Sequence, residues 1–161
     1  MIEVNFQNKK GKLKLKSKDV LETLRLRPDF EYVEDISNTI NQKNIMVFDC
    51  SLDKSVFRYE ELEDLIEELG EDVDESYFQV LFEDIRAYLK DACDEIEADL
   101  QEEYTYDNLR CYFEIYDIDD TFTDVKFVFV ISFANIKIAS LMNLTKIISK
   151  RLLQGESKYY N

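Results

Sequence analysis

An unbroken helical pattern from Ser76 to Glu102 limits what this chain can fold into. Apolar side chains recur there every three or four positions over about six helical turns, and no Gly or Pro occurs between Glu71 and Glu102. We therefore expect one amphipathic helix, roughly 40 Å long at about 1.5 Å per residue, with Ser76 as its N-cap. Its apolar stripe must be buried against the rest of the chain. The stripe consists of Phe78, Leu81, Phe82, Ile85, Leu89, Ala92, Cys93, Ile96 and Leu100.

Negative charge is concentrated around this helix. Residues 59–107 contain 20 of the 35 acidic residues of the chain and only two of its 20 cations, so this stretch has a net charge of −18. The remaining residues sum to +3, and the whole chain to −15. Lysines and arginines are instead gathered in residues 1–27 and 125–161. The acidic stretch therefore lacks compensating cations nearby in the sequence.

The carboxylates of this stretch repel one another. Asp91 stands three residues before Asp94 and four before Glu95, spacings at which like charges destabilise a helix by a few tenths of a kcal/mol per pair. A second acidic amphipathic helix is predicted over residues 59–69, just before a C-cap at Gly70. The chain tolerates this destabilisation, and binding to a cationic partner would explain it.

Strand and helix patterns also occur in the rest of the chain. Residues 29–42 fit either a strand or a helix, since Phe30 and Tyr32 alternate like a strand while Val33, Ile36 and Ile40 keep helical spacing. The other predicted elements are a β-hairpin over 1–16, a helix over 17–27 capped by Ser17, strands over 44–50, 109–118 and 124–138, and a helix over 139–153 capped by Ser140.

This order of elements favours an α+β fold. We expect a mixed or antiparallel sheet of about five strands with helices on one face, including the long acidic helix at about 76–102. The strand that begins after Asp124 is apolar on both faces near its middle, which places it inside the sheet. We expect a single domain over residues 1–161, in which 58–107 form an acidic helical segment and 155–161 a flexible tail.

The residue types exclude several kinds of active site. The chain has no histidine, so His-based triads are excluded and a zinc site is not expected. Only three glycines occur, too few for a phosphate-binding loop.

Cys50, Cys93 and Cys111 lie within apolar patterns and are expected to be buried thiols in a reducing compartment. The longest apolar run, residues 125–134, is too short to span a bilayer. We expect a cytoplasmic protein that is not an enzyme and has no cofactor or metal.

Acidic residues around the predicted loop at 119–123 leave one enzymatic alternative open. In a magnesium-dependent nuclease, carboxylates hold the metal and a lysine positions the attacking water. The residues that fit these roles are Asp117, Asp119, Asp124 and Lys126. A calcium-binding loop does not fit, because Phe122 replaces the required glycine and Val128 the bidentate glutamate.

The net charge of −15 disfavours direct binding of nucleic acid or an anionic membrane and favours a basic partner protein. Carboxylates repeated along a helix face imitate the charge of a phosphate backbone. Our main hypothesis is a small acidic inhibitor that binds the nucleic-acid-binding surface of a nuclease or effector in a bacterial host cell. It would act as a DNA or RNA mimic of the anti-CRISPR or anti-restriction type, used in phage counter-defence. The predicted partner-binding residues are Glu60, Glu61, Glu63, Asp64, Glu67, Glu68, Glu71, Asp72, Asp74, Glu75, Asp84, Asp91, Asp94 and Glu95.

Other interpretations of the chain are also open. An immunity protein or antitoxin that neutralises a basic nuclease toxin would need the same acidic surface. An adaptor would instead use aromatic side chains, and acidity that serves only solubility would need no partner. A homodimer is compatible with the sequence as well. The aromatic residues considered for an adaptor surface are Tyr104, Tyr106, Tyr112 and Tyr116.

Overall fold

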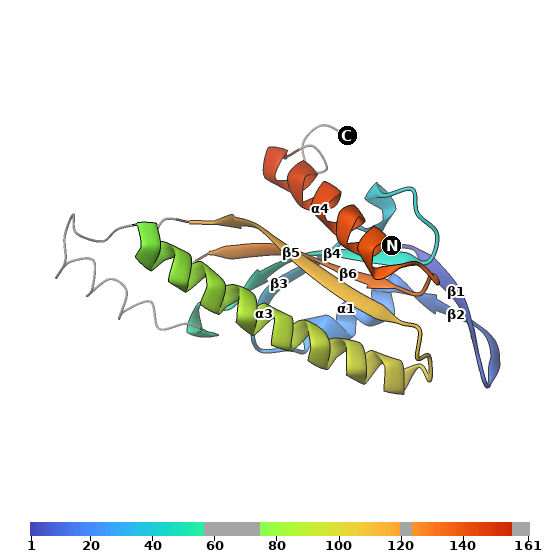
Figure 1. The fold of residues 1–161 in the computed structure, drawn as a ribbon. Coiled ribbons are helices and arrows are strands. Elements are labelled where there is room, and N and C mark those ends of the chain that lie inside the picture. The colour runs from blue at the N-terminus through green and yellow to red at the C-terminus, as the bar shows by residue number, and fades with distance from the viewer. Residues whose placement is uncertain (57–74, 120–123, 156–161) are drawn as a thin grey trace.

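The computed structural model describes residues 1–56, 75–119 and 124–155 of the chain (Figure 1). A small antiparallel sheet pairs β1 (Glu3–Asn8) with β2 (Gly11–Lys16). The large sheet is also antiparallel, with the order β3-β4-β6-β5, and consists of β3 (Phe30–Asp35), β4 (Ile45–Leu52), β5 (Arg110–Ile118) and β6 (Val125–Ser132). The helices are α1 (Ser17–Arg25), α3 (Glu75–Glu103) and α4 (Ile138–Gln154), and two short 3-10 turns are η1 (Ser37–Thr39) and η2 (Lys54–Val56). The α+β class predicted from the sequence is confirmed.

The two central strands are buried on both of their faces. All eight residues of β4 are buried, and in β6 only Lys126 is partly exposed. Strands in such positions are recognised by near-continuous apolar sequence rather than by alternation. The interior position predicted for the strand that begins after Asp124 is therefore confirmed, and β4 is interior as well. The one charged residue of β4, Asp49, is buried with its neighbours.

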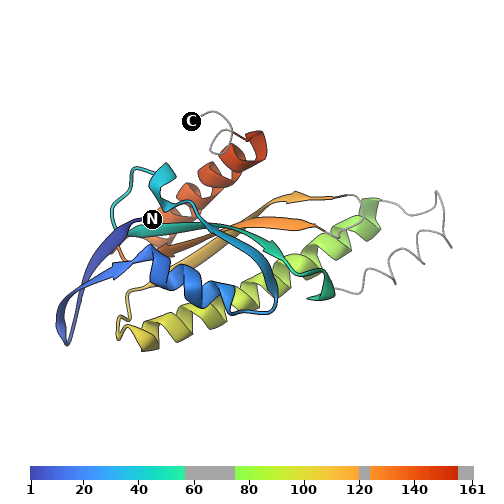
Figure 2. The same ribbon diagram turned by 180° about the vertical axis from the view of Figure 1, so that it is seen from behind.

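Helices cover both faces of the large sheet, so the prediction of helices on one face is wrong (Figures 1 and 2). The physical reason is that β4 and β6 direct apolar side chains toward both faces, and each face must be shielded from water. On one face, the hairpin, α1 and α3 pack over Phe48, Phe127 and Phe129. On the other face, α4 packs over Val47, Val128 and Val130 through Leu141, Ile148 and Leu152.

The long helix follows the sequence prediction to within one residue at each end. It runs from Glu75 to Glu103, and the apolar stripe faces the sheet. The fully buried part of the stripe consists of Ile85, Leu89, Ala92, Cys93, Ile96 and Leu100. The helix predicted over residues 59–69 and the predicted tail lie outside the described residues.

Several predicted element ends differ from the structure. β6 stops at Ser132 rather than near 138, because the Ser132 hydroxyl bonds to the N–H and C=O of Ala134 in a turn. Neither Ser17 nor Ser140 caps a helix, since the N-cap positions are Lys16 and Lys137. The ambiguous stretch at 29–42 forms β3 followed by η1.

Ser17 serves the fold in a different way. Its buried hydroxyl accepts a hydrogen bond from the Ile2 N–H at 2.8 Å and donates one to the Asp35 carboxylate at 2.5 Å. This side chain therefore connects the β1–β2 hairpin to the end of β3.

A substitution at Leu89 tests how much the contact between α3 and the sheet stabilises the protein. Its side chain is 2% exposed. Truncating a buried leucine costs about 2–5 kcal/mol, from the lost transfer free energy and the cavity that remains. We expect Leu89→Ala to lower the free energy of unfolding by about 3 kcal/mol in urea denaturation.

Leu153→Ala is the matched control, because the same truncation is made at a side chain that is 62% exposed. We expect it to change the free energy of unfolding by less than about 0.5 kcal/mol. Similar losses for the two variants would contradict the packing of α3 described above.

Candidate functional site

Four carboxylates lie on one side of α3 and point away from the core. Asp84, Asp91, Glu95 and Glu102 are all exposed and follow one another at spacings of seven, four and seven residues. At 3.6 residues per turn, these spacings place them within about 20° of one line along the helix. The acidic stripe, as we call these four residues, is about 27 Å long at about 1.5 Å per residue. Asp99, also exposed, lies beside it.

Among the described residues, one cation from outside the helix reaches the acidic stripe. The Arg27 guanidinium bonds to the Asp29 carboxylate at 2.9 Å and to Glu95 at 3.2 Å. Tyr88 of α3 donates its hydroxyl proton to Asp29 at 3.0 Å. This network fixes the outer side of α3 to the connection between α1 and β3. It neutralises Glu95 in part, whereas Asp84, Asp91 and Glu102 form no ion pair within the described part of the chain.

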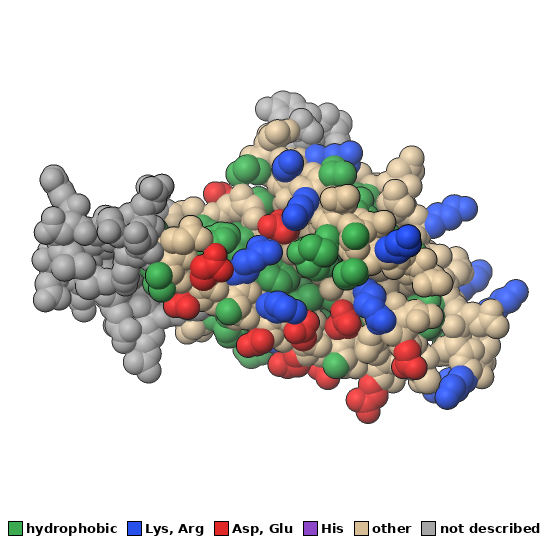
Figure 3. All heavy atoms as spheres, in the orientation of Figure 1, with side chains coloured by type: hydrophobic (Ala, Val, Ile, Leu, Met, Phe, Trp, Pro, Cys, Tyr) green, Lys and Arg blue, Asp and Glu red, His purple; other side chains and the backbone are tan. Residues whose placement is uncertain are grey.

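The other flank of α3, which faces β5, has mixed charge. Lys90 pairs with Asp94 at 3.2 Å, and Arg86 reaches Glu114 on β5 at 3.4 Å. Glu97 accepts the backbone N–H of Cys111 at 2.9 Å. Figure 3 shows acidic side chains along α3, while lysine and arginine side chains lie between α3 and α4 and on the β1–β2 hairpin. The two flanks of α3 therefore differ in charge: the flank with the acidic stripe is negative, and the flank that faces β5 carries both signs.

The structure brings together only some of the predicted partner-binding residues. Asp84, Asp91 and Glu95 belong to the acidic stripe, whereas Asp94 lies about 100° around the helix from Glu95 and pairs with Lys90. Glu75 begins α3. The prediction missed Glu102, which could have been found from its spacing of 18 residues after Asp84, five full turns of a helix. Nine predicted residues lie outside the described part: Glu60, Glu61, Glu63, Asp64, Glu67, Glu68, Glu71, Asp72 and Asp74.

The aromatic residues considered for an adaptor surface do not form one patch. Tyr104 and Tyr106 pack around Phe6 on the α3 side of the sheet, and the Tyr106 hydroxyl donates to the Phe133 carbonyl at 3.0 Å. Tyr112 and Tyr116 belong to the core on the α4 side. Packing inside the protein therefore uses much of their surface.

A buried polar pair spans the large sheet on the α4 side. The Tyr116 hydroxyl on β5 donates to the Asp49 carboxylate on β4 at 2.6 Å, across the intervening strand β6. Asp49 is 1% exposed. Burial, together with the hydrogen bond to Asp49, raises the pKa of Tyr116 well above its usual range. The Tyr116 hydroxyl therefore keeps its proton, and its hydrogen bond to Asp49 connects β5 to the centre of the sheet.

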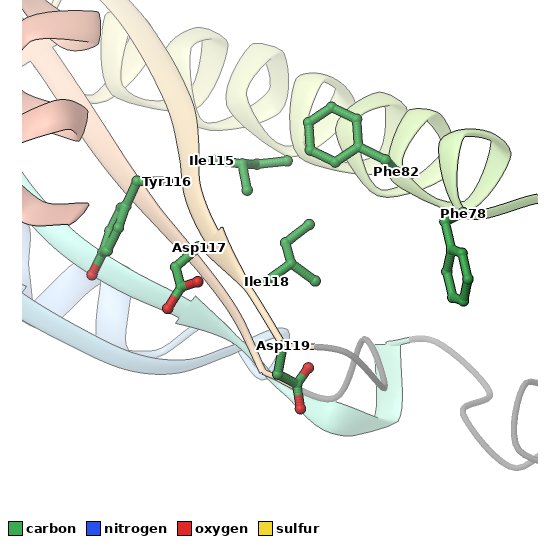
Figure 4. A pocket seen from close by; sticks show the side chains of 7 residues that line it. All are labelled: Phe78, Phe82, Ile115, Tyr116, Asp117, Ile118 and Asp119. Carbon is green, nitrogen blue, oxygen red and sulfur yellow. The ribbon is translucent and has the colours of Figure 1, made fainter. Parts of the chain in front are cut away.

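The residues of the nuclease alternative are arranged around the β5–β6 connection. The Asp124 N–H donates to the Asp119 carboxylate at 2.9 Å, and Lys126 lies 3.7 Å from Asp124. Asp117 and Asp119 line a pocket of about 610 Å³ together with apolar side chains of α3 and β5 (Figure 4). Those apolar side chains are Phe78, Phe82, Ile115 and Ile118. Among the described residues, no three Asp, Glu, Cys or His side chains form a group that could hold a metal ion.

All three cysteines are buried free thiols, as the sequence predicts. Burial raises the pKa of Cys93 to about 12 and raises those of Cys50 and Cys111 as well. Thiols protonated in this way are poor nucleophiles and weak metal ligands.

Comparison of the chain with protein-family models, with curated proteins and with solved structures finds no match. In the part of the chain that the structure describes, no helix is both long enough and apolar enough to cross a membrane.

Tyr88 reports on the network that holds the outer side of α3. Burial, followed by the hydrogen bond to Asp29, raises the pKa of Tyr88 from 10.0 to about 12. Because the raised pKa favours the neutral phenol in the folded state, this stabilisation is complete below pH 10.0 and is lost as the pH rises toward about 12. We expect Tyr88→Phe to remove one tyrosine titrating near pH 12, seen as a difference in tyrosinate absorbance from the wild type.

A second substitution tests whether the hydrogen bond to Asp29 contributes to the raised pKa of Tyr88. Asp29→Asn weakens the acceptor of the Tyr88 hydroxyl, so the same difference titration should move part of the way back toward 10.0. A titration of Tyr88 already centred near 10.0 in the wild type would contradict the network.

Proposed function

We propose that this protein is an acidic inhibitor whose α3 stripe binds the basic, nucleic-acid-binding surface of a partner protein. In this role the carboxylates take the place of phosphates, as in DNA or RNA mimics of the anti-CRISPR or anti-restriction type in bacterial cells. The observation that carries the proposal is the alignment of Asp84, Asp91, Glu95 and Glu102 on one exposed side of a helix whose other side is buried.

The support for this stripe is rigid. Six residues of α3 are fully buried in the core, and the Arg27–Asp29–Tyr88 contacts hold the helix from its outer side. A carboxylate array that is already ordered before binding loses less side-chain and backbone entropy when a partner orders around it. Salt screens exposed charges over about 10 Å at 0.1 M, so association through this surface would be fast at low salt.

The spacing of the stripe bears on what it can imitate. Four carboxylates over about 27 Å give one charge per roughly 9 Å along the line, against one phosphate per about 3.4 Å along one strand of a duplex. The stripe therefore matches the charge of selected phosphates rather than of a whole backbone. A partner whose arginines contact phosphates at intervals along a groove fits this spacing.

Charge reversal on the stripe tests the proposal. The triple variant Asp84→Lys, Asp91→Lys and Glu102→Lys leaves the buried side of α3 unchanged. Wild-type protein is expected to inhibit DNA cleavage by at least one member of a panel of RNA-guided nucleases and restriction enzymes, with steep weakening between roughly 50 and 500 mM salt. The triple variant is expected to lose at least about tenfold in inhibitory affinity, since each charged contact contributes about 1 kcal/mol or more.

The matched control makes the same change in net charge elsewhere. Glu3, Glu22 and Glu31 are exposed and lie on β1, α1 and β3. Reversal of these three to lysine is expected to leave inhibition within about twofold of the wild type, because they lie outside the stripe. Equal loss in both triple variants would show that only net charge matters, and would refute a specific role for α3.

A further inference from the structure

β5 forms one edge of the large sheet, and part of its outer backbone has no strand partner among the described residues. The Cys111 N–H points away from β6, because it donates to the Glu97 carboxylate. Backbone groups alternate in direction along a strand, so Phe113, two residues later, also directs its N–H and C=O outward. No described residue outside β6 bonds to these Phe113 groups. Such an edge can accept another strand.

The opposite edge of the sheet is already covered. Arg25 of α1 donates two hydrogen bonds, of 3.1 and 2.9 Å, to the Val33 carbonyl of β3, and α1 packs along this strand. The pairing of β3 is also irregular between Phe30 and Tyr32. β5 keeps a regular register from Arg110 to Ile115 and is thus the edge suited to strand addition.

A groove of about 370 Å³ lies along the β5 edge between α3 and α4. Its base is formed by Cys111, Tyr112 and Phe113, and Ile138 of α4 adds to the apolar lining. Figure 3 shows apolar side chains on this face between α3 and α4, with lysine and arginine side chains around them and acidic side chains along α3. The charged lining consists of three cations and two carboxylates, Asp94 and Glu97. Because cations are in excess, an apolar centre of this kind favours a segment with apolar residues between carboxylates.

Three cations line the groove and are only partly neutralised. Lys90 and Arg86 have carboxylate partners at 3.2 and 3.4 Å, in Asp94 and Glu114. Arg110 donates to the carbonyl oxygens of Asp107 and Leu109 rather than to a carboxylate. The groove therefore differs in charge from the acidic stripe on the other flank of α3 and calls for a different ligand.

We propose that the β5 edge binds an extended acidic–apolar segment of a partner protein as an added strand. The main chain of this segment would bond to Phe113, its apolar side chains would fill the groove, and its carboxylates would lie beside Lys90, Arg86 and Arg110.

A second copy of the whole chain does not fit this edge in the same way. Adjacent strands lie about 4.8 Å apart, whereas packed helices need about 8–10 Å between their axes. Both α3 and α4 pack on β5, so the helices of two copies paired through β5 would collide. A segment without such helices avoids this collision.

Glu97 occupies part of the place that an added strand would take. Its carboxylate accepts the Cys111 N–H, as the carbonyl of a neighbouring strand would. Removing this side chain frees a backbone donor and takes a negative charge out of a groove that receives carboxylates. Glu97→Ala should therefore strengthen binding, which is the opposite of what a general loss of structure would do.

The experiment uses the full chain and the capped peptide Glu-Val-Ile-Val-Glu as probe, followed by fluorescence anisotropy and amide hydrogen exchange. The peptide is expected to slow exchange of the outward Phe113 amide, while the Tyr112 amide, which faces β6, stays protected throughout. A version with lysine at both ends, and one with N-methylated backbone amides, should each bind at least about tenfold more weakly.

Variants of the protein locate the site. Lys90→Glu is expected to weaken peptide binding roughly fivefold to tenfold, and Glu97→Ala to tighten it about threefold. Lys14→Glu on β2 is the matched control and should bind as the wild type does. The proposal is overturned if the peptide leaves Phe113 exchange unchanged, if the N-methylated peptide binds equally well, or if Lys14→Glu and Lys90→Glu weaken binding alike. Self-association through β5 at the protein concentrations used would also overturn it.

Discussion

The burial of β4 and β6 on both faces is the constraint from which the rest of the architecture follows. Two adjacent strands that are apolar in both directions need a layer of helices above and another below. The hairpin, α1 and α3 supply one layer, and α4 supplies the other. The core leaves room for few polar groups, and the buried carboxylate of Asp49 is accommodated by the hydroxyl of Tyr116.

The burial of the sheet also determines which sides of α3 carry its charged side chains. The apolar stripe is buried from Ile85 to Leu100, which is about four turns at about 3.6 residues per turn. The carboxylates are therefore confined to the two flanks and the outer side of the helix. On the flank toward α1 they stand almost without cations, apart from Arg27 at Glu95. On the flank toward β5 they meet Lys90 and Arg86. One helix thus presents two surfaces of different electrostatic character.

Charged side chains also protect the edges of the large sheet. Arg25 occupies the Val33 carbonyl on β3, and Glu97 occupies the Cys111 N–H on β5. Each takes a backbone group that could otherwise pair with another chain. The protection of β5 extends over one outward residue. The next outward residue, Phe113, lies at the base of a groove and has no described strand partner on its outer side. The difference between the two edges arises because α1 lies along β3, while α3 and α4 stand on either side of β5.

The sequence by itself determined the α+β class, the interior position of the strand that begins after Asp124 and the extent of α3 to within one residue, because hydrophobic periodicity reports local structure and burial directly. It also located the acidic stretch. It did not show that helices cover both faces or that Arg27 reaches Glu95. Serine capping at Ser17 was wrong for a related reason, since a hydroxyl that fits a local cap bonds instead to Ile2 and Asp35. Only the tertiary structure decided these points, because partners 15 or more residues apart are selected by packing and not by local spacing.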